Sequence, residues 1–348
     1  MATKKRPTST ASVTRRKKAS VSAPKRARSS ASKDPTEGKE RSSGDASALP
    51  PPARRPIKVV KHAPPVIERG PWEAHQGEYW RSPDSRARLI QGDSLDILEQ
   101  LPEGSVDVIF ADPPYFLSNG GTTCQGGKRV SVNKGKWDAS LGAQDNHAFN
   151  KRWLSACQRV LADNGTIWVS GTAHVIFSVG YAMQELGFKM LNDIVWEKPN
   201  PPPNLSCRYF THSTELVLWA AKTRKSKHYY DYQEMKLRNG GKQMKNVWRF
   251  TAPGKSEKTH GKHPTQKPLA LLDRLLMASC HPDARVLDPF NGSGTTGVAA
   301  AKLGLQYTGL EREPEYLALS KARLIDAVPA WAQAAAKPPA RPKIAAVG

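Results

Sequence analysis

The chain has 348 residues, of which 38% are hydrophobic, and a formal net charge of +22 at pH 7. This length and composition suffice for one full α/β core with tails, and the charge far exceeds what solubility requires, which indicates a polyanionic partner such as nucleic acid. No apolar run is long enough for a membrane span, and the four scattered cysteines lack the pattern of a disulfide framework or a zinc site. We therefore expect a reducing cytoplasm, no membrane and no metal.

Residues 1–68 consist largely of Lys, Arg, Ser, Ala, Thr and Pro. With almost no large apolar side chain, this segment cannot recover the entropy lost on ordering, so we predict a disordered basic tail. It either holds nucleic acid through phosphates without sequence preference or is a dispensable solvated tail, and both interpretations stay open. It lacks the leucines of an amphipathic transit peptide. Residues 329–348, rich in Ala, Pro and Lys, are also predicted to be a tail, which leaves 69–328 as the folded domain.

From Arg88 onward, short apolar strands alternate with longer helical segments. Strands are predicted at 88–92, 106–111, 166–170, 190–196, 285–288 and 307–311. Helices are predicted at 94–100, 150–161, 175–185, 268–279, 295–303 and 315–327. This alternation predicts a doubly wound, mostly parallel α/β sheet. Residues 222–262 are polar, basic and aromatic without a clean period, so we predict an insertion outside the sheet.

The strand predicted at 106–111 ends in Asp112-Pro113-Pro114-Tyr115, and ligands of open α/β sheets bind at such strand ends. The two prolines fix φ and remove two N–H donors. The exocyclic amine of a nucleobase has a lone pair delocalised into the ring, and it becomes nucleophilic when acceptors hold its hydrogens. Asp112 and the Pro113 carbonyl are candidate acceptors, and Tyr115 is a candidate to stack on a base that has left the helix. The alternative is a strand-ending turn without a chemical role.

Residues 286–296 are predicted to form a strand, a Gly-rich turn and a helix start. Glycines let the backbone approach a ligand at a helix N-terminus, where free N–H groups favour a carboxylate or phosphate. The turn has neither the G-x-G-x-x-G of dinucleotide enzymes nor the Gly-Lys-Ser/Thr of a P-loop. Glu311 ends a strand about 20 residues downstream, where an acidic side chain can accept both hydroxyls of a ribose. Residues 263–268 precede a predicted helix, and a proline-initiated helix start explains them equally simply.

These motifs resemble those of the amino-methylating DNA methyltransferases. D-P-P-Y at 112–115 matches their [DNS]-P-P-[YFW] motif, D-P-F-N-G-S-G-T-T at 288–296 is similar to their S-adenosylmethionine motif, and H-P-T-Q-K-P at 263–268 is similar to the motif before it. The order of the motifs over about 78–327 resembles the β group of this family. The resemblance implies a Rossmann-like fold with permuted motif order, S-adenosylmethionine as cofactor, and methylation of DNA at N6 of adenine. Cytosine N4, an RNA base, and a catalytically silent DNA-binding protein are the alternatives.

The resemblance also implies roles for individual residues. The catalytic positions are Asp112, Pro113, Pro114 and Tyr115. Asp93 is expected at the amine of the cofactor's adenine, although it is equally well placed to be the N-cap of the helix at 94–100. The implied cofactor-binding set is Asp93, His263, Thr265, Lys267, Asp288, Phe290, Asn291, Gly292, Ser293, Gly294, Thr295 and Glu311.

In the same family, residues 222–262 correspond to the target-recognition region, and 116–138 and 195–220 resemble adenine methylases that act on GATC and tolerate single strands. We expect Trp196 and Trp219 in the core rather than at a base. The residues expected to contact double-stranded or single-stranded DNA are Asn200, Asn204, Arg208, Lys222, Arg224, Lys225, Lys227 and Arg238. The resemblance indicates the bacterial or phage cytoplasm, with the protein at the nucleoid, and leaves open a homodimer and a cognate restriction endonuclease.

Overall fold

The computed structural model describes residues 72–118, 122–125, 128–131 and 138–335. The tail predicted at 1–68 lies outside these residues, as do 336–348 and much of the 116–138 loop. All described elements belong to the compact unit that begins at Lys58. Among the described residues, no helix combines the length and the hydropathy needed to cross a membrane.

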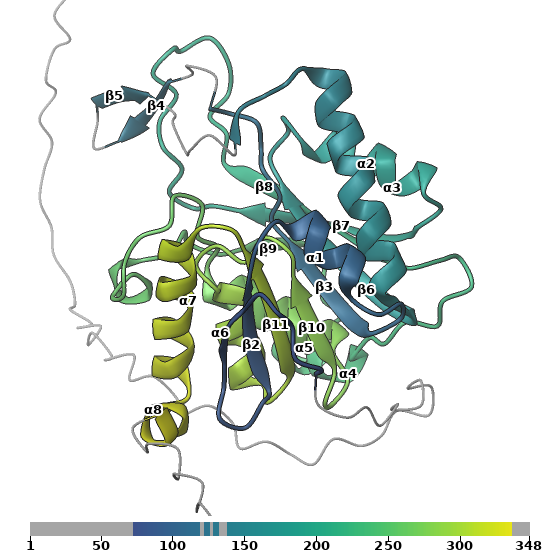
Figure 1. Cartoon of the computed structure of the whole chain (residues 1–348). Helices are drawn as coiled ribbons and strands as arrows, with labels where there is room; N and C mark the ends of the chain where they lie inside the picture. The colour runs from purple at the N-terminus through teal and green to yellow at the C-terminus, as the bar shows by residue number, and fades with distance from the viewer. Residues whose placement is uncertain (1–71, 119–121, 126–127, 132–137, 336–348) are drawn as a thin grey trace, which may run out of the picture. The chain divides into compact units, whose positions relative to one another are not determined.

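A nine-stranded sheet organises this unit, in the order β1-β2-β11-β10-β3-β6-β8-β7-β9 (Figure 1). Neighbours from β2 to β6 in this order pair in parallel, whereas β8 is antiparallel to both of its neighbours and β1 is antiparallel to β2. The strands are β1 (Glu78–Arg81), β2 (Ala87–Gln91), β3 (Val106–Ala111), β6 (Leu161–Gly171), β7 (Lys189–Glu197), β8 (Thr214–Ala221), β9 (Val247–Arg249), β10 (Arg285–Asp288) and β11 (Gln306–Glu311). A separate hairpin joins β4 (Thr122–Gln125) to β5 (Lys128–Ser131).

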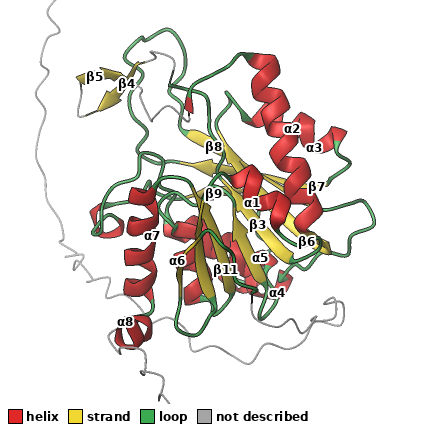
Figure 2. Ribbon diagram, in the orientation of Figure 1, coloured by secondary structure: helices red, strands yellow, loops and turns green. Residues whose placement is uncertain are grey.

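Helices cover both faces of the sheet (Figure 2). On one face, α1 (Ser94–Gln100), α2 (Ala143–Val160) and α3 (Ile176–Glu185) share a core with Ile109 of β3. On the other face, α5 (Leu269–Ser279), α6 (Thr295–Lys302) and α7 (Pro314–Ala327) share a core with Phe110. Successive residues of a strand point to opposite faces, so β3 needs an apolar side chain at nearly every position. This explains its continuous apolar sequence.

Every strand and helix predicted from the sequence is present, and α1, β3 and β10 have the predicted ends, whereas the ends of the others are shifted. Helix α2 begins at Ala143 rather than at Asn150, because its first turns are polar and give no apolar period. Strand β8 was not predicted. Its apolar run is buried on both faces and therefore does not alternate. Trp219 in β8 is buried and stacks on Trp168 of β6 at 4.5 Å, and Trp196 is buried as well, so the expectation that both tryptophans lie in the core is confirmed.

Two predictions about segments outside the sheet are wrong. Residues 222–262 contribute β9, which pairs in parallel with β7 at the sheet's edge, and α4 (Tyr232–Arg238). Residues 329–335, expected to be tail, form α8 (Pro329–Ala335). The indole of Trp331 in α8 is buried, donates to Asp84 at 2.9 Å and packs edge-on against Trp80. Burial of one tryptophan explains why an Ala- and Pro-rich segment is ordered there.

Candidate active site

Strands β3 and β10 bring the two main motifs together. They are adjacent and parallel, with Val108 opposite Val286 and Ile109 opposite Leu287. Asp112 directly follows β3 and Asp288 ends β10, so the two motifs emerge side by side, as the sequence predicted. The chain leaves β3 toward β6 on one side and leaves β10 toward β11 on the other. Open α/β sheets form their ligand crevice at this kind of reversal. We call the carboxyl ends of β3, β6, β10 and β11 the site edge.

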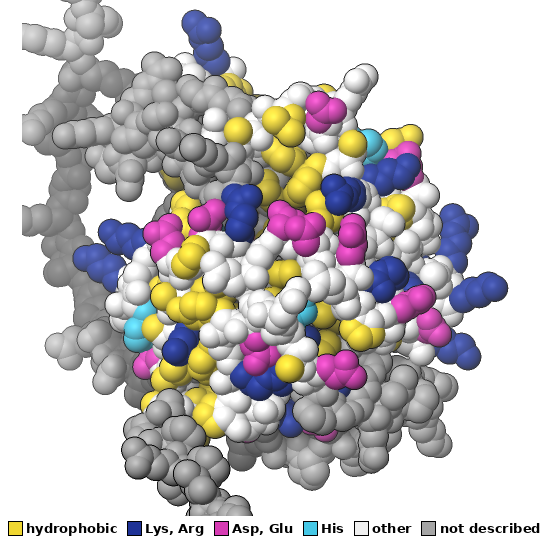
Figure 3. All heavy atoms as spheres, viewed as in Figure 1, with side chains coloured by type: hydrophobic (Ala, Val, Ile, Leu, Met, Phe, Trp, Pro, Cys, Tyr) yellow, Lys and Arg dark blue, Asp and Glu magenta, His cyan; other side chains and the backbone are white. Residues whose placement is uncertain are grey.

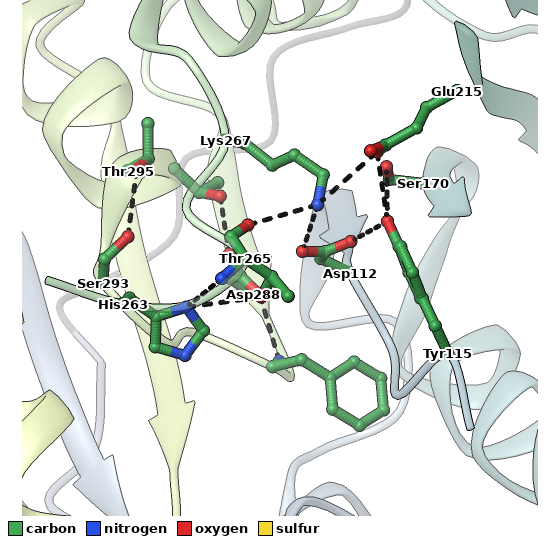
Figure 4. Close-up of polar contacts among 12 residues, drawn as sticks. Asp112, Tyr115, Ser170, Glu215, His263, Thr265, Lys267, Asp288, Ser293 and Thr295 are labelled. Atoms are coloured by element: carbon green, nitrogen blue, oxygen red, sulfur yellow. Dashed lines mark hydrogen bonds and ion pairs between the residues drawn. The ribbon is translucent and has the colours of Figure 1, made fainter. Parts of the chain in front are cut away.

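Asp112 lies at the centre of a buried group of charged and hydroxyl side chains (Figure 4). The ammonium of Lys267 donates to Oδ2 of Asp112 at 2.5 Å, and the Tyr115 hydroxyl donates to Oδ1 at 2.7 Å. The Tyr115 oxygen also lies 3.2 Å from Ser170 Oγ and 3.4 Å from Glu215 Oε2. Both carboxylate oxygens of Asp112 are therefore held in fixed directions, one by a donor three residues away and the other by a donor 155 positions away.

Glu215 is the second carboxylate of this group. Its Oε2 lies 3.9 Å from the Lys267 ammonium, and its Oε1 is paired with Lys198. Glu215 reaches the site edge because β8 runs antiparallel to β6, which places the start of β8 where the parallel strands end. One buried lysine thus faces two carboxylates, and a second lysine approaches from the loop before β8.

Burial dominates the electrostatics of the group. It raises the pKa of Asp112, and the Lys267 charge opposes that rise. Burial alone would lower the pKa of Lys267, but the charges of Asp112 and Glu215 raise it, so the ammonium stays protonated. Burial and the two carboxylates also raise the pKa of the Tyr115 hydroxyl well above its usual range, so Tyr115 remains a neutral donor. These pKa shifts are those expected of a buried Asp112–Lys267 ion pair that accepts a hydrogen bond from the Tyr115 hydroxyl.

Tyr115 is only 4% exposed, and its ring lies under the Lys267 ammonium, 5.2 Å away. In this conformation the ring is covered, and the expectation that it stacks on a base stays a prediction. Asp138, which fixes the loop after Tyr115, was not predicted as a site residue. Its carboxylate accepts from the backbone N–H groups of Tyr115, Phe116 and Leu117 at 2.8–3.1 Å.

A cavity of about 190 Å³ opens beside Asp112 at the site edge. Its lining includes Asp112 and Pro114, and it also includes half of the residues predicted to bind the cofactor: Asp93, His263, Thr265, Phe290, Gly292 and Glu311. Asp93 accepts from the Leu95 N–H at 2.9 Å, so it is the N-cap of α1 as well as a wall of the cavity. Pro113 is buried and does not line the cavity.

The cavity's residues suit S-adenosylmethionine. Glu311 accepts from the backbone N–H groups of Gly292 at 2.8 Å and Glu313 at 2.9 Å, and each of its oxygens keeps a lone pair for a ribose hydroxyl. Burial raises the pKa of Glu311. Phe290 offers an apolar wall and is held edge-on by Trp153 at 5.4 Å. A Cβ on Gly292 would come within 3.0 Å of the His263 ring, so only glycine leaves the backbone this close to the cavity.

The remaining residues predicted to bind cofactor build the turn behind the cavity. Asp288 accepts from the Phe290 N–H at 3.0 Å and the Thr296 hydroxyl at 2.6 Å, and burial raises its pKa to about 7. Gly294 has a φ of +71° and caps α6. Asn291, Ser293, Thr295 and Lys267 line a smaller cavity of about 20 Å³ with His263 and Asp288. Lys267 therefore lies beside both Asp112 and this turn.

The basic residues that follow β8 do not lie at the site edge. The end of β8 pairs with Thr166 of β6, which lies opposite Val108 near the start of β3. Four basic residues that follow β8 therefore lie at the end of the parallel strands away from Asp112: Lys222, Arg224, Lys225 and Lys227. The Lys222 ammonium donates to the Leu161 carbonyl at 2.6 Å, and Arg238 is paired with Glu234 within α4. These residues therefore lie away from Asp112, and their expected contact with DNA stays a prediction.

Two other connections do reach the site edge. Residues 198–213 join β7 to β8 there and carry Asn200, Asn204 and Arg208. The chain also returns through β9, so residues 250–262 lead from that edge to His263. On the face shown in Figure 3, Lys and Arg side chains are interspersed with Asp and Glu. The described residues on that face therefore form no large patch of a single sign.

Comparisons with known proteins agree with this geometry. A family model described as DNA methylase, for N6 and N4 methyltransferases, matches residues 106–322. The type II methyltransferase M2.LlaDCHI of Lactococcus lactis subsp. cremoris is 55% identical over 239 residues, which cover 68% of this chain and 89% of the relative. M2.MboI of Moraxella bovis is 51% identical over 72% of this chain and 92% of its own. The crystal structure of the M1.HpyAVI–SAM complex is similar with a TM-score of 0.53 and 27% identity, covering 68% of this chain and 98% of the other.

Proposed function

The chain belongs to the family of N6 and N4 DNA methylases, and from this premise we propose that it transfers a methyl group to N6 of adenine in a GATC-type DNA site. It is an S-adenosylmethionine-dependent DNA methyltransferase with the α/β fold of that class. The position of the Asp112 carboxylate is the observation that supports methylation of an amino group at this site. This carboxylate is held by Lys267 and Tyr115 and forms part of the wall of the 190 Å³ cavity.

The chain's own residues make the amine reactive. Asp112 and the Pro113 carbonyl accept hydrogen bonds from the two N6 hydrogens, which turns the nitrogen lone pair toward the cavity. S-adenosylmethionine supplies the electrophilic methyl group. The N–C bond forms while the C–S bond breaks with its electron pair going to sulfur, and one N6 proton passes to Asp112. No covalent adduct with the protein is required, and the Gly-rich turn carries no Pro-Cys nucleophile.

Lys267 and Tyr115 make this proton transfer possible in a dry site. A carboxylate buried alone would be protonated and could not accept. The Lys267 charge stabilises the ionised form, and the Tyr115 hydroxyl fixes the rotation of the carboxylate. In this conformation Tyr115 acts through its hydroxyl, and its ring serves as a wall under Lys267 rather than as a clamp on the base.

The cofactor is held by the residues around the cavity. Glu311 would accept hydrogen bonds from the ribose hydroxyls of the cofactor. Phe290 would pack on the cofactor's adenine, and Asp93 would accept a hydrogen bond from the adenine amine. His263, Thr265 and the Gly292 backbone enclose the methionine end, and Asp288, Asn291, Ser293, Gly294 and Thr295 keep the turn in shape behind them. Their location around one cavity next to Asp112 supports this assignment.

DNA recognition is assigned to the loops at the site edge, 198–213 and 250–262, together with the loop after Tyr115. The substrate is double-stranded DNA, with single strands also accepted. We further propose that the protein acts as a homodimer and has a cognate restriction endonuclease. We also propose that it is a bacterial or phage protein located at the nucleoid.

The test is transfer of labelled methyl groups to DNA by the full chain, followed by mass spectrometry of the nucleosides and long-read sequencing of the product. We expect N6-methyladenine within GATC. N4-methylcytosine, or label in RNA alone, would contradict the proposal. Asp112→Ala is expected to abolish transfer while cofactor binding, measured by calorimetry, stays intact. Near-normal turnover by this variant would rule out the role of Asp112.

A further inference from the structure

The loop of residues 198–213 is tied to the catalytic group at its base. Its ends pair through the Lys198 N–H and the Ser213 carbonyl at 2.8 Å. The Lys198 ammonium pairs with Glu215, and Glu215 in turn lies 3.4 Å from the Tyr115 hydroxyl. The loop therefore rises from the site edge beside Asp112, where DNA must approach for a base to reach the carboxylate.

Asn204 gives the loop an internal framework. Its side-chain amide donates to the Tyr209 carbonyl at 2.6 Å, and its oxygen accepts from the N–H and hydroxyl of Ser206 at 2.9 and 2.7 Å. Residues 201–203 are three consecutive prolines, which restrict the backbone before Asn204. Asn204 was expected to contact DNA, but its polar atoms are used within the loop. Its effect is to fix where the next residues point.

The residues that this framework presents are aromatic and open to solvent. Tyr209 is 62% exposed and Phe210 is 97% exposed. The Tyr209 ring packs against the His212 ring, with 5.6 Å between the ring centroids. The His212 ring lies 6.5 Å from the ring of His174, just before α3. Leu205 in the same loop is 50% exposed, and several exposed apolar side chains gathered on one loop indicate a surface that contacts a partner.

We propose that Phe210 inserts into the DNA duplex and fills the gap left when the target base rotates out to Asp112. The inference rests on the proposed function, because only an enzyme that reacts with an extruded base creates such a gap. Aromatic side chains stack on bases, and apolar side chains of DNA-binding proteins act as wedges between base steps. The exposed Arg208, two positions away, adds a positive charge for the adjacent phosphate.

The experiment compares two DNA substrates for the full chain. One is a duplex that carries the sequence methylated by the wild-type protein. The other is the same duplex with the target adenine opposite an abasic position, where extrusion is already easier. We expect Phe210→Ala to lower kcat/KM on the paired duplex at least about tenfold and on the abasic duplex less than about threefold. Phe210→Trp should keep most of the activity on both.

Tyr181→Ala is the matched control, since Tyr181 is another exposed aromatic but lies in the middle of α3. It should leave both rates unchanged. As a second measure, 2-aminopurine at the target position should become strongly fluorescent with wild-type protein and much less so with Phe210→Ala at saturating concentration. Equal loss on both duplexes would mean a structural or chemical role and would overturn the proposal, as would no loss on either.

The same proteins distinguish a failure of the Phe210 wedge from a failure of the proposed methylation of DNA. A change in sedimentation coefficient on Phe210→Ala would assign the ring to contact with a second copy of the chain and overturn the wedge. A wild-type protein that methylates no DNA would overturn the proposed function and the wedge together. A wild-type protein that methylates adenine, with a Phe210→Ala variant that extrudes 2-aminopurine normally, would overturn the wedge alone.

Discussion

The ammonium of Lys267 lies 2.5 Å from the carboxylate of Asp112, although 155 positions separate the two residues. Both side chains are largely buried, with 6% and 12% of their surfaces exposed. Removing one partner of such a pair leaves the other charge without compensation, which costs about 3–5 kcal/mol. The pair therefore ties the motif before α5 to the motif after β3.

The first prediction concerns this pair and pH. Because Lys267 lowers the pKa of Asp112, Lys267→Met should raise it and move the acid limb of kcat/KM to higher pH. Turnover at pH 7 should fall by about 100-fold or more, in line with the cost of an unpaired buried charge. Lys267→Arg should keep part of the wild-type rate, and its acid limb of kcat/KM should lie at the wild-type pH. An unshifted pH profile in Lys267→Met would contradict the role given to the ammonium.

The second prediction concerns Asp288, whose pKa burial raises to about 7 in the folded chain. An unfolded Asp ionises near pH 4, so between about pH 4 and 7 the folded state holds a proton that the unfolded state has lost. This contribution to stability falls as pH rises through that window, by at most about 1.4 kcal/mol per pH unit. Asp288→Asn should remove it. Thermal unfolding at pH 5 and pH 8 would check that the wild type, but not the variant, shows this loss.

The third prediction compares two glycines with the same backbone conformation. Gly294 and Gly304 have φ values of +71° and +69°, but a Cβ on Gly294 would lie 2.0 Å from Ser320 Oγ, whereas at Gly304 nothing lies within 4 Å. Gly304→Ala should cost about 1 kcal/mol of backbone strain. Gly294→Ala should cost more and should also weaken cofactor binding. Equal unfolding midpoints in urea would disprove the close packing at the start of α6.

The fourth prediction tests which basic residues meet DNA. Lys255 and Lys262 lie on the connection at the site edge, whereas Arg224 and Lys225 lie at the end of the parallel strands away from Asp112, and all four are exposed. Replacing Lys255 and Lys262 by Ala should lower the salt dependence of DNA affinity, by up to about 0.9 in log–log slope for each lost phosphate contact. The same change at Arg224 and Lys225 should leave it unaltered. Fluorescence anisotropy at several salt concentrations measures both, and a reversed result would assign the phosphate contacts to Arg224 and Lys225 instead.

The strands and the cofactor turn could be predicted because their causes are local. Apolar runs mark β3 and β10, and Gly292 and Gly294 mark a turn that other residues cannot make. The side chains that contact the Tyr115 hydroxyl could not be predicted in the same way. Ser170 and Glu215 belong to strands whose order and direction depend on the whole sheet, and β8 had no alternating pattern to identify it. Without the direction of β8, the sequence could not show that the basic residues after it lie at the end of the sheet away from Asp112.

The position of β3 between two parts of the sheet has a consequence for rate. On one side lie β10, β11 and β2, which carry residues proposed to bind the methyl donor, and on the other lie β6, β8 and β7, which carry side chains proposed to surround the acceptor. The coiling of the sheet across β3 therefore sets how far apart the two reactants sit. A misplacement of about 1 Å can cost 100-fold in rate, so a core substitution that flattens or overwinds the sheet at β3 would slow methylation without touching either reactant.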